Sequence, residues 1–186
     1  MELQRVLPGI STEQLRSRLN RMVADGLLTR QRYREVPPRV DYELTERSRE
    51  LMPVLGALAR WGYDWAWSAP REGEDVNVGA VFRLAPGLID TPPGLEGSVE
   101  LIVQAEGEAP ERRYRLTATG GRLEISERGT GDGVGATVSG TPAAWVRALG
   151  PDGTSDELDF SGNRGLADTV LTGFTTAAAR RAAAAA

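Results

Sequence analysis

The sequence contains no cysteine and no histidine among its 186 residues. Without cysteine it can form no disulfide, no thiolate nucleophile and no zinc–cysteine site. Without histidine it has no imidazole base or metal ligand, and no serine–histidine–aspartate triad can be built. The acidic residues do not organise into a paired-carboxylate site either. We therefore predict that the chain is not an enzyme, has no catalytic residues and requires no metal or cofactor.

Lysine is also absent, so all 22 basic residues are arginine. We attribute this chiefly to the coding bias of a GC-rich gene, although arginine forms bidentate contacts to phosphate and guanine better than lysine does. Long apolar runs are missing as well. No run approaches the roughly 20 residues that span a bilayer, and the first residues lack the apolar core of a secretory signal. We expect no membrane partner.

The net charge of −4 is distributed unevenly along the chain. Residues 1–67 carry 11 arginines against 9 acids, whereas residues 68–186 carry 11 against 17. A basic face matters more for nucleic-acid binding than the total charge does, so such binding stays open for the first part. The polar segment 68–77 contains proline and glycine, which favours a linker between two domains.

The clearest helix of the sequence begins at Ser11, where Ser11 and Gln14 have the spacing of a capping box. Leu15, Leu19 and the Met22–Val23 pair recur at helical spacing. The face opposite these apolar residues carries hydroxyls, amides and arginines, which suit phosphates and base edges. A merely solvated helix face is the alternative. The candidate contact residues of this helix are Ser11, Thr12, Gln14, Arg16, Ser17, Arg18, Asn20 and Arg21.

A hairpin is predicted directly after this helix. Residues 27–34 have the pattern of a strand, and residues 40–44 have the pattern of a return strand. Because of their shared parity, Arg30, Arg32 and Arg34 project from one face, and Arg39 lies near the tip. Alone, such arginines could protect a solvated edge from aggregation. Since a short apolar helix pattern closed by Pro8-Gly9 precedes the capped helix, we interpret the whole as a helix-turn-helix with a wing.

Residues 2–62 resemble the HxlR-type winged-helix family of bacterial transcription regulators, most specifically in "LPGIS", "GLLTRQRY" and "VPPRVDYELT". The resemblance implies a cytoplasmic, dimeric DNA-binding repressor or activator, with its recognition helix on residues 11–24 and its wing on residues 28–44. Family members begin with a further helix and strand, and Met1 falls inside the second helix of their pattern. We expect a misassigned start codon, a truncation or a lost segment to explain this departure.

A further helix is predicted to start at Thr45, with a kink where Pro53 removes an intrahelical hydrogen bond. Its apolar residues from Leu51 to Leu58 cover more than one stripe, and four aromatic residues follow within 61–67. These residues could pack within their own chain, or they could form a subunit interface, where tryptophan and tyrosine are favoured. The family resemblance favours the interface, and we predict a homodimer.

The second half predicts an antiparallel sheet packed with helices, which makes the whole chain α+β. Apolar residues alternate from Val76 to Phe82, and strands are expected at residues 98–105, 112–119, 122–127 and 135–139. Gly120-Gly121 is a hairpin signal. Thr141-Pro142 predicts a helix start, Leu158 and Phe160 suggest a last strand, and residues 161–163 open a final helix.

The motifs "ATVSGTPAAWVRALG" and "LDFSGNRGLADTVLTGF" resemble the sterol-carrier-protein type two fold, over residues 76–176. The resemblance implies an apolar tunnel between sheet and helices for a lipid-like ligand. For each candidate lining residue the alternative is ordinary core packing. The candidates are Phe82, Leu84, Trp145, Leu149, Phe160, Leu171 and Phe174.

These patterns together predict a winged helix with its dimerisation helix in residues 1–67, a linker at 68–77, a sterol-carrier-like domain at 78–176 and an alanine-rich tail at 177–186. Our leading hypothesis is a regulator that binds double-stranded DNA and senses a hydrophobic small molecule. The alternative is a lipid or small-molecule carrier whose degenerate winged helix serves only dimerisation.

Overall fold

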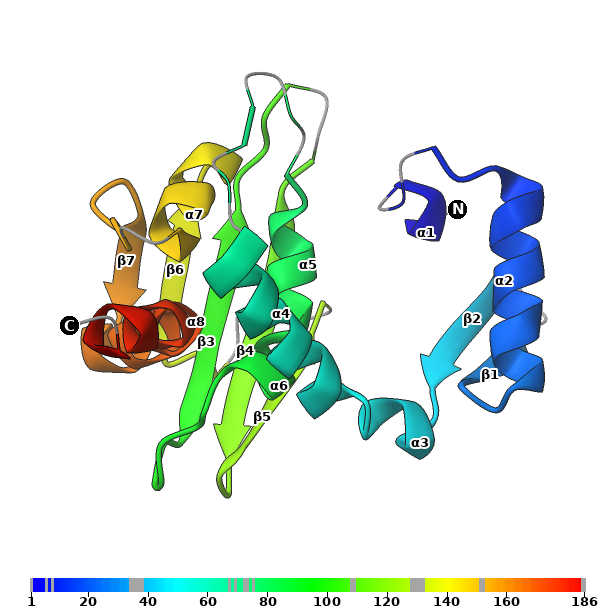
Figure 1. Cartoon of the computed structure of the whole chain (residues 1–186), viewed down its shortest axis with the longest axis horizontal. Helices are drawn as coiled ribbons and strands as arrows, with labels where there is room; N and C mark the ends of the chain where they lie inside the picture. The colour runs from blue at the N-terminus through cyan, green and yellow to red at the C-terminus, as the bar shows by residue number, and fades with distance from the viewer. Residues whose placement is uncertain are drawn as a thin grey trace. The chain divides into compact units, whose positions relative to one another are not determined.

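The computed structural model describes residues 2–5, 7, 9–33, 39–66, 68, 70–71, 74, 76–107, 110–127, 133–150 and 153–184. Helices and two separate sheets make up the chain, which confirms the predicted α+β class (Figure 1). By its internal contacts the chain divides into two units, Met1–Met52 and Pro53–Ala186. The division falls before the predicted linker. The domain boundaries inferred from the sequence remain a prediction.

The first unit contains the predicted helix-turn-helix and hairpin. Its elements, in order, are α1 (Glu2–Arg5), α2 (Thr12–Ala24), β1 (Leu28–Tyr33), β2 (Arg39–Leu44) and α3 (Glu46–Arg49). The two strands are antiparallel, and Leu28 pairs with Leu44. Among the described residues of this unit, the buried apolar side chains are those of Leu15 and Leu28. A core this small gives the unit little burial of its own.

The helix expected from Thr45 onward is two helices in the structure. α3 ends at Arg49, and α4 (Met52–Ala66) begins three residues later. Pro53 lies in the first turn of α4, where a missing N–H costs no intrahelical hydrogen bond. The proline therefore marks a new start rather than a kink inside one helix.

The second unit is built on a five-stranded sheet with the strand order β5-β4-β3-β6-β7. Its strands are β3 (Gly97–Val103), β4 (Arg112–Thr119), β5 (Arg122–Ser126), β6 (Ala136–Gly140) and β7 (Asp159–Gly162). The sheet is mixed and not purely antiparallel, because β3 and β6 run parallel. Both residues of the Gly120-Gly121 turn have positive φ, 57° and 76°. Two successive positive φ values are what a type I′ hairpin turn requires.

Helices pack on one face of this sheet and enclose its core with it (Figure 1). They are α4, α5 (Val78–Arg83), α6 (Ala85–Leu88), α7 (Pro142–Leu149) and α8 (Arg164–Ala184). The predicted start of α7 is confirmed, since the Thr141 hydroxyl accepts from the Ala144 amide at 3.1 Å. The start of α8 is fixed similarly by Asn163, whose side-chain oxygen accepts from Leu166 N at 3.1 Å.

The alternation of apolar residues from Val76 to Phe82, which is typical of a strand, belongs here to helix α5 over residues 78–83. The Asn77 side chain caps this helix by accepting from Ala80 N at 3.2 Å. Val78 and Phe82, four residues apart, are both buried on its inner side. An apolar residue at every second position also satisfies the i, i+4 spacing of a helix. The alternation therefore could not distinguish a strand from a helix.

In the described part of the chain, no helix combines the length and the apolar character that crossing a membrane requires. The described residues of the predicted linker segment, 68, 70–71, 74 and 76–77, belong to no helix or strand. The alanine-rich tail continues helix α8 as far as Ala184.

We expect Phe82→Ala to lower the free energy of unfolding of the second unit by about 3–5 kcal/mol, because Phe82 is fully buried at the centre of its core. Phe82→Leu, which keeps most of the volume, should cost less than about 1.5 kcal/mol. Urea unfolding followed by far-UV circular dichroism measures both. Equal losses for the two variants would mean that Phe82 borders an open cavity and not a packed core.

Candidate functional site

The start of α2 is held by the predicted capping box. The Ser11 hydroxyl accepts from the Gln14 amide at 3.2 Å, and the Gln14 side-chain oxygen accepts from Ser11 N at 3.1 Å. Gln4, on α1, donates from its side-chain amide to the Thr12 hydroxyl at 2.8 Å. Three predicted contact residues thus also fix the helix start. The Nε2 group of Gln14 takes no part in the capping box.

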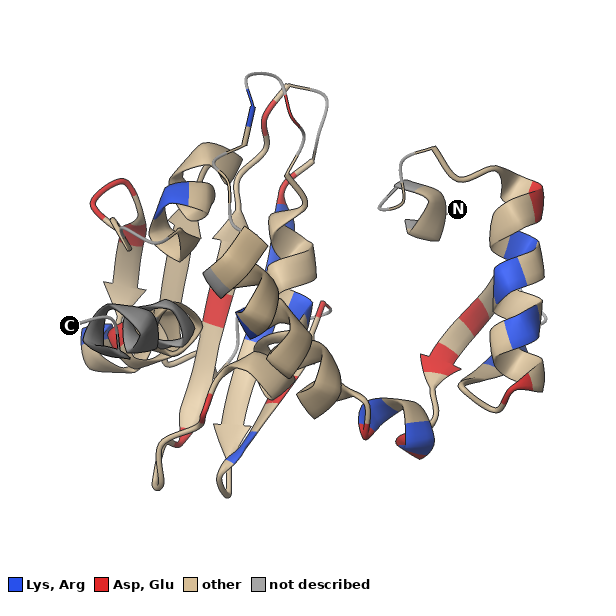
Figure 2. Ribbon diagram, viewed as in Figure 1, with Lys and Arg blue, Asp and Glu red and all other residues tan. Residues whose placement is uncertain are grey.

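The exposed face of α2 carries most of the predicted contact residues. Leu15 is buried beneath the helix, whereas all five remaining candidates are exposed: Arg16, Ser17, Arg18, Asn20 and Arg21. Figure 2 shows basic residues gathered in the middle of this helix. Arg21 forms an exposed ion pair with Asp25 at 3.3 Å, and such a pair contributes at most about 1 kcal/mol. Arg21 can therefore be recruited by another anion at little cost.

The hairpin separates its charges by face. The register pairs Arg30 with Tyr42 and Arg32 with Val40, so these four side chains share one face. Asp41 and the other acid of β2, Glu43, lie on the opposite face, and Figure 2 shows β2 banded in red. Alternation along two paired strands thus gives one face that suits a polyanion.

The Arg30 guanidinium lies 5.9 Å from the centroid of the Tyr42 ring, which is a cation–π contact. The sequence analysis did not identify Tyr42, although the pairing of two alternating strands could have placed it beside Arg30. Of the other predicted wing residues, Arg34 and the side chain of Arg39 lie outside the described residues.

The base of the hairpin is tied to the end of α2. The Thr45 hydroxyl donates to Gly26 O at 2.8 Å, and Arg47 donates to Asp25 O at 3.2 Å. Ser48, which is buried, donates from its hydroxyl to Leu27 O. These bonds use carbonyls that follow the last turn of the helix. They fix the end of the hairpin to the loop that follows α2.

In the second unit, the candidate ligand-lining residues pack mainly on one another. The ring centroid of Phe82 lies 4.8 Å from that of Trp145 and 5.9 Å from that of Phe174. Trp145 is fully buried and donates from its indole to Ile102 O at 2.9 Å. Five of the seven candidates are buried and two are partly buried in the same cluster, namely Phe82, Trp145, Leu149, Leu171 and Phe174, then Leu84 and Phe160. The structure brings them together as a packed core.

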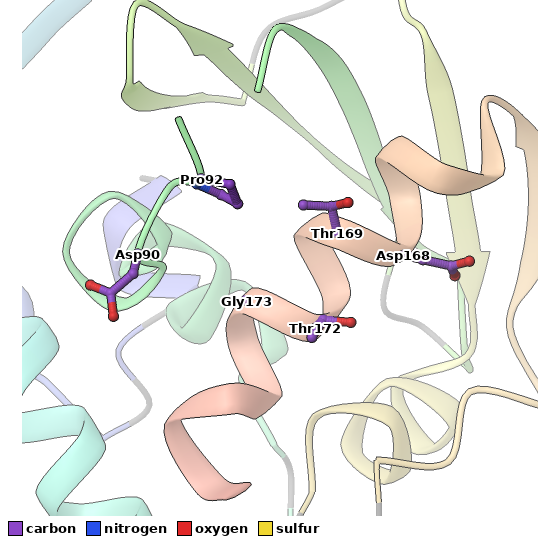
Figure 3. Close-up of a pocket in the computed structure, with 6 residues that line it drawn as sticks. All are labelled: Asp90, Pro92, Asp168, Thr169, Thr172 and Gly173. Atoms are coloured by element: carbon purple, nitrogen blue, oxygen red, sulfur yellow. The ribbon is translucent and has the colours of Figure 1, made fainter. Parts of the chain in front are cut away.

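A shallow depression of about 310 Å³ lies outside this core, between α8 and the segment after α6 (Figure 3). The carboxylates of Asp90 and Asp168 point away from one another, to opposite sides. Its lining contains none of the seven candidates and consists of Asp90, Pro92, Asp168, Thr169, Thr172 and Gly173. The described residues contain no group of acidic side chains that could hold a metal ion.

Arg83, a charged group at the edge of the core, is not among the residues predicted from the sequence. The Nε of Arg83 donates to Glu127 at 2.6 Å, and the guanidinium lies 5.4 Å from the centroid of the Tyr114 ring. Burial alone would lower the pKa of Arg83, but Glu127 and Tyr114 outweigh it and raise this pKa above its ordinary value. Glu127 and Tyr114 thus favour the charged form of Arg83 at the edge of the core.

Residues 1–69 match the family model described as HxlR-like helix-turn-helix. An uncharacterised HTH-type transcriptional regulator of Synechocystis sp. is 47% identical over 64 residues, which are 34% of this chain and 47% of the relative. YkvN of Bacillus subtilis, described likewise, is 40% identical over 73 residues, which are 39% of this chain and 62% of the relative. The chain thus spans about half the length of the curated relatives it matches.

Among solved structures, a conserved protein of Thermus thermophilus, described as a candidate sterol carrier protein, is similar over 60% of this chain and 96% of its own. The identity is 14% and the TM-score is 0.40. This similarity is too low to assign a ligand or an activity to the second unit.

We expect Ser11→Ala to lower the opening free energy of the α2 amides by about 1 kcal/mol, because the substitution removes the cap of the helix. Ser17→Ala, an identical change at an exposed position inside the helix, should leave it unchanged or raise it slightly through helix propensity. Amide hydrogen exchange of α2 measures both values. Equal shifts in the two variants would contradict the role of the cap.

Proposed function

Because residues 1–69 carry an HxlR-like helix-turn-helix segment, we propose that this chain is a transcription regulator that binds double-stranded DNA. The observations that carry the proposal are the arginine-bearing exposed face of α2 and, in the hairpin that follows it, the shared face of Arg30 and Arg32 opposite Asp41 and Glu43. A helix of this kind fits the major groove, and a hairpin beside it meets the phosphate backbone.

The two elements have different roles in this proposal. Arg30 and Arg32 contact phosphates, which gives affinity without sequence preference. Ser17, Asn20 and Arg21, on the outward face of α2, are exposed polar groups that can reach base edges, which gives specificity. Gln14 contributes only its Nε2 group, since its side-chain oxygen accepts from Ser11 N. Arg16 and Arg18 add positive charge at the flanks of this face.

We further propose that the chain acts as a homodimer through α4, because two reading helices on one dimer can engage two half-sites. The support is an exposed apolar surface on this helix, which includes Leu58 at 61% exposure and Trp65 at 67%. A water-exposed surface of this kind commonly marks an interface. Trp67, the last residue of the predicted aromatic cluster, lies outside the described residues.

For the second unit we propose sensing of a hydrophobic small molecule. Its support is the aromatic cluster of Phe82, Trp145 and Phe174 at the centre of the unit. Since this core is packed, a ligand would have to select a more open, less populated conformation. If the chain binds such molecules but not DNA, the carrier alternative replaces the regulator.

We expect Arg32→Ala to weaken binding to all DNA sequences alike and to lower the salt slope of the affinity by about 1, since one phosphate contact is lost. Asn20→Ala should cost roughly 1–3 kcal/mol only on the preferred sequence, because it removes a base contact. Fluorescence anisotropy with duplexes from the protein's own promoter region, at several salt concentrations, measures both.

The control for these variants is Arg122→Ala, which removes an exposed arginine from the second unit. It should leave both the affinity and the salt slope unchanged. If Arg32→Ala and Asn20→Ala behave like this control, the basic face of the first unit is only solvated surface.

We expect light scattering at micromolar concentration to give a mass twice the 20.0 kDa of a single chain. Leu58→Asp should give monomers, because it places a charge in the middle of the exposed apolar surface of α4. Ala57→Asp, one residue away and at the edge of that surface, should leave the dimer intact, since charges are tolerated there. A monomeric wild-type chain would contradict the proposed dimer.

A further inference from the structure

Helix α4 carries a regular apolar stripe whose side chains are largely exposed. Its members recur at alternating spacings of four and three residues, which is the pattern of a coiled-coil seam. Their exposures range from 58% for Trp61 to 67% for Trp65. We refer to these residues as the α4 stripe; they are Val54, Leu58, Trp61 and Trp65.

The opposite face of α4 is packed into the second unit. Gly56 is buried against the backbone of Gly87 in α6, where a Cβ atom would overlap the Gly87 carbonyl oxygen. Ala59, one turn further along, packs against the hydrophobic core. A close approach of two backbones that only glycine permits fixes the position of one helix on another.

Arg60 adds hydrogen bonds to the contact between α4 and α6. Its Nη1 donates to the carbonyl oxygen of Leu88 at 2.8 Å and to that of Gly87 at 3.4 Å. These carbonyls stand at the C-terminal end of α6, where they have no intrahelical partner and where the helix dipole favours a cation. Leu88 and the following Ile89 are themselves buried in the core. Arg60 therefore connects α4 to a segment whose side chains are part of the core.

We propose that α4 couples self-association of the chain to the folding of the second unit, with a second copy of this chain as the partner of the α4 stripe. The inference rests on the proposed dimer and extends it. The stripe is uncharged and has a self-complementary heptad spacing, which suits another α4. Because the same helix is built into the core through Gly56 and Arg60, each dimer contact stabilises two folded second units.

The coupling is reciprocal by thermodynamic necessity. Whatever tightens or loosens the core beneath α6 changes the population of dimers, and dimer formation protects the core in return. Helix α4 and the sheet belong to the same contact unit, Pro53–Ala186, so association through α4 would act directly on the unit that contains the sheet.

The test is amide hydrogen exchange of the full chain at two protein concentrations, followed by mass spectrometry. The readout is β3, the central strand of the sheet. If the second unit opens only as a monomer, a roughly tenfold rise in concentration above the dissociation constant slows β3 exchange about threefold by mass action. Unchanged β3 exchange in a chain that is dimeric by light scattering would overturn the coupling and leave the dimer standing.

Two variants and a control complete the experiment. Arg60→Ala and Gly56→Val should each reduce the concentration dependence of β3 exchange towards none, because they detach α4 from α6. Arg49→Ala, which removes an exposed arginine of α3, should keep the threefold effect. If Arg60→Ala and Gly56→Val also keep the threefold effect, the coupling does not depend on the contact between α4 and α6, and the proposal fails. A chain that is monomeric at both concentrations would overturn the proposed dimer and the coupling together.

Discussion

Helix α4 contributes one face to the core of the second unit and exposes an apolar stripe on the other. One face is covered by α6, through the close contact of Gly56 with Gly87 and the hydrogen bonds from Arg60. The other face, the α4 stripe, is exposed in the single chain. In the proposed dimer, association through the α4 stripe therefore involves the second unit.

The first unit depends on local polar contacts more than on a core. Among its described residues, the buried apolar side chains are those of Leu15 and Leu28, which make a small core. The capping box at Ser11 and the bonds from Thr45 and Arg47 to the end of α2 fix the helix and the hairpin instead. Polar fixation of this kind leaves the arginine-bearing faces free for a ligand of opposite charge.

The elements that depend on neighbouring residues could be predicted from the sequence. Elements whose residue spacing fits both a helix and a strand could not. The capping box at Ser11, the Gly120-Gly121 turn and the start of α7 depend on neighbouring residues, and all three were correctly placed. Val78 and Phe82 of helix α5 fit both periods. The parallel pairing of β3 with β6 joins distant residues, so no local pattern could reveal it.

The candidate sites follow the same division. The exposed arginines of α2 and the face shared by Arg30 and Arg32 were predictable from periodicity alone. That the seven aromatic and aliphatic candidates of the second unit would pack together, rather than line a hollow, depends on the volumes of all of them at once. The role of Arg60 was equally hidden, because its partners are backbone carbonyls 27 and 28 residues away.

The central claim is that two copies of this chain read DNA together through α2. The most direct measurement is selection of bound sequences from a random double-stranded DNA library by the full chain, followed by sequencing. We predict enrichment of an inverted repeat whose half-sites are centred one helical turn, or a multiple of it, apart. Recovery of sequences no different from the starting library would contradict the claim.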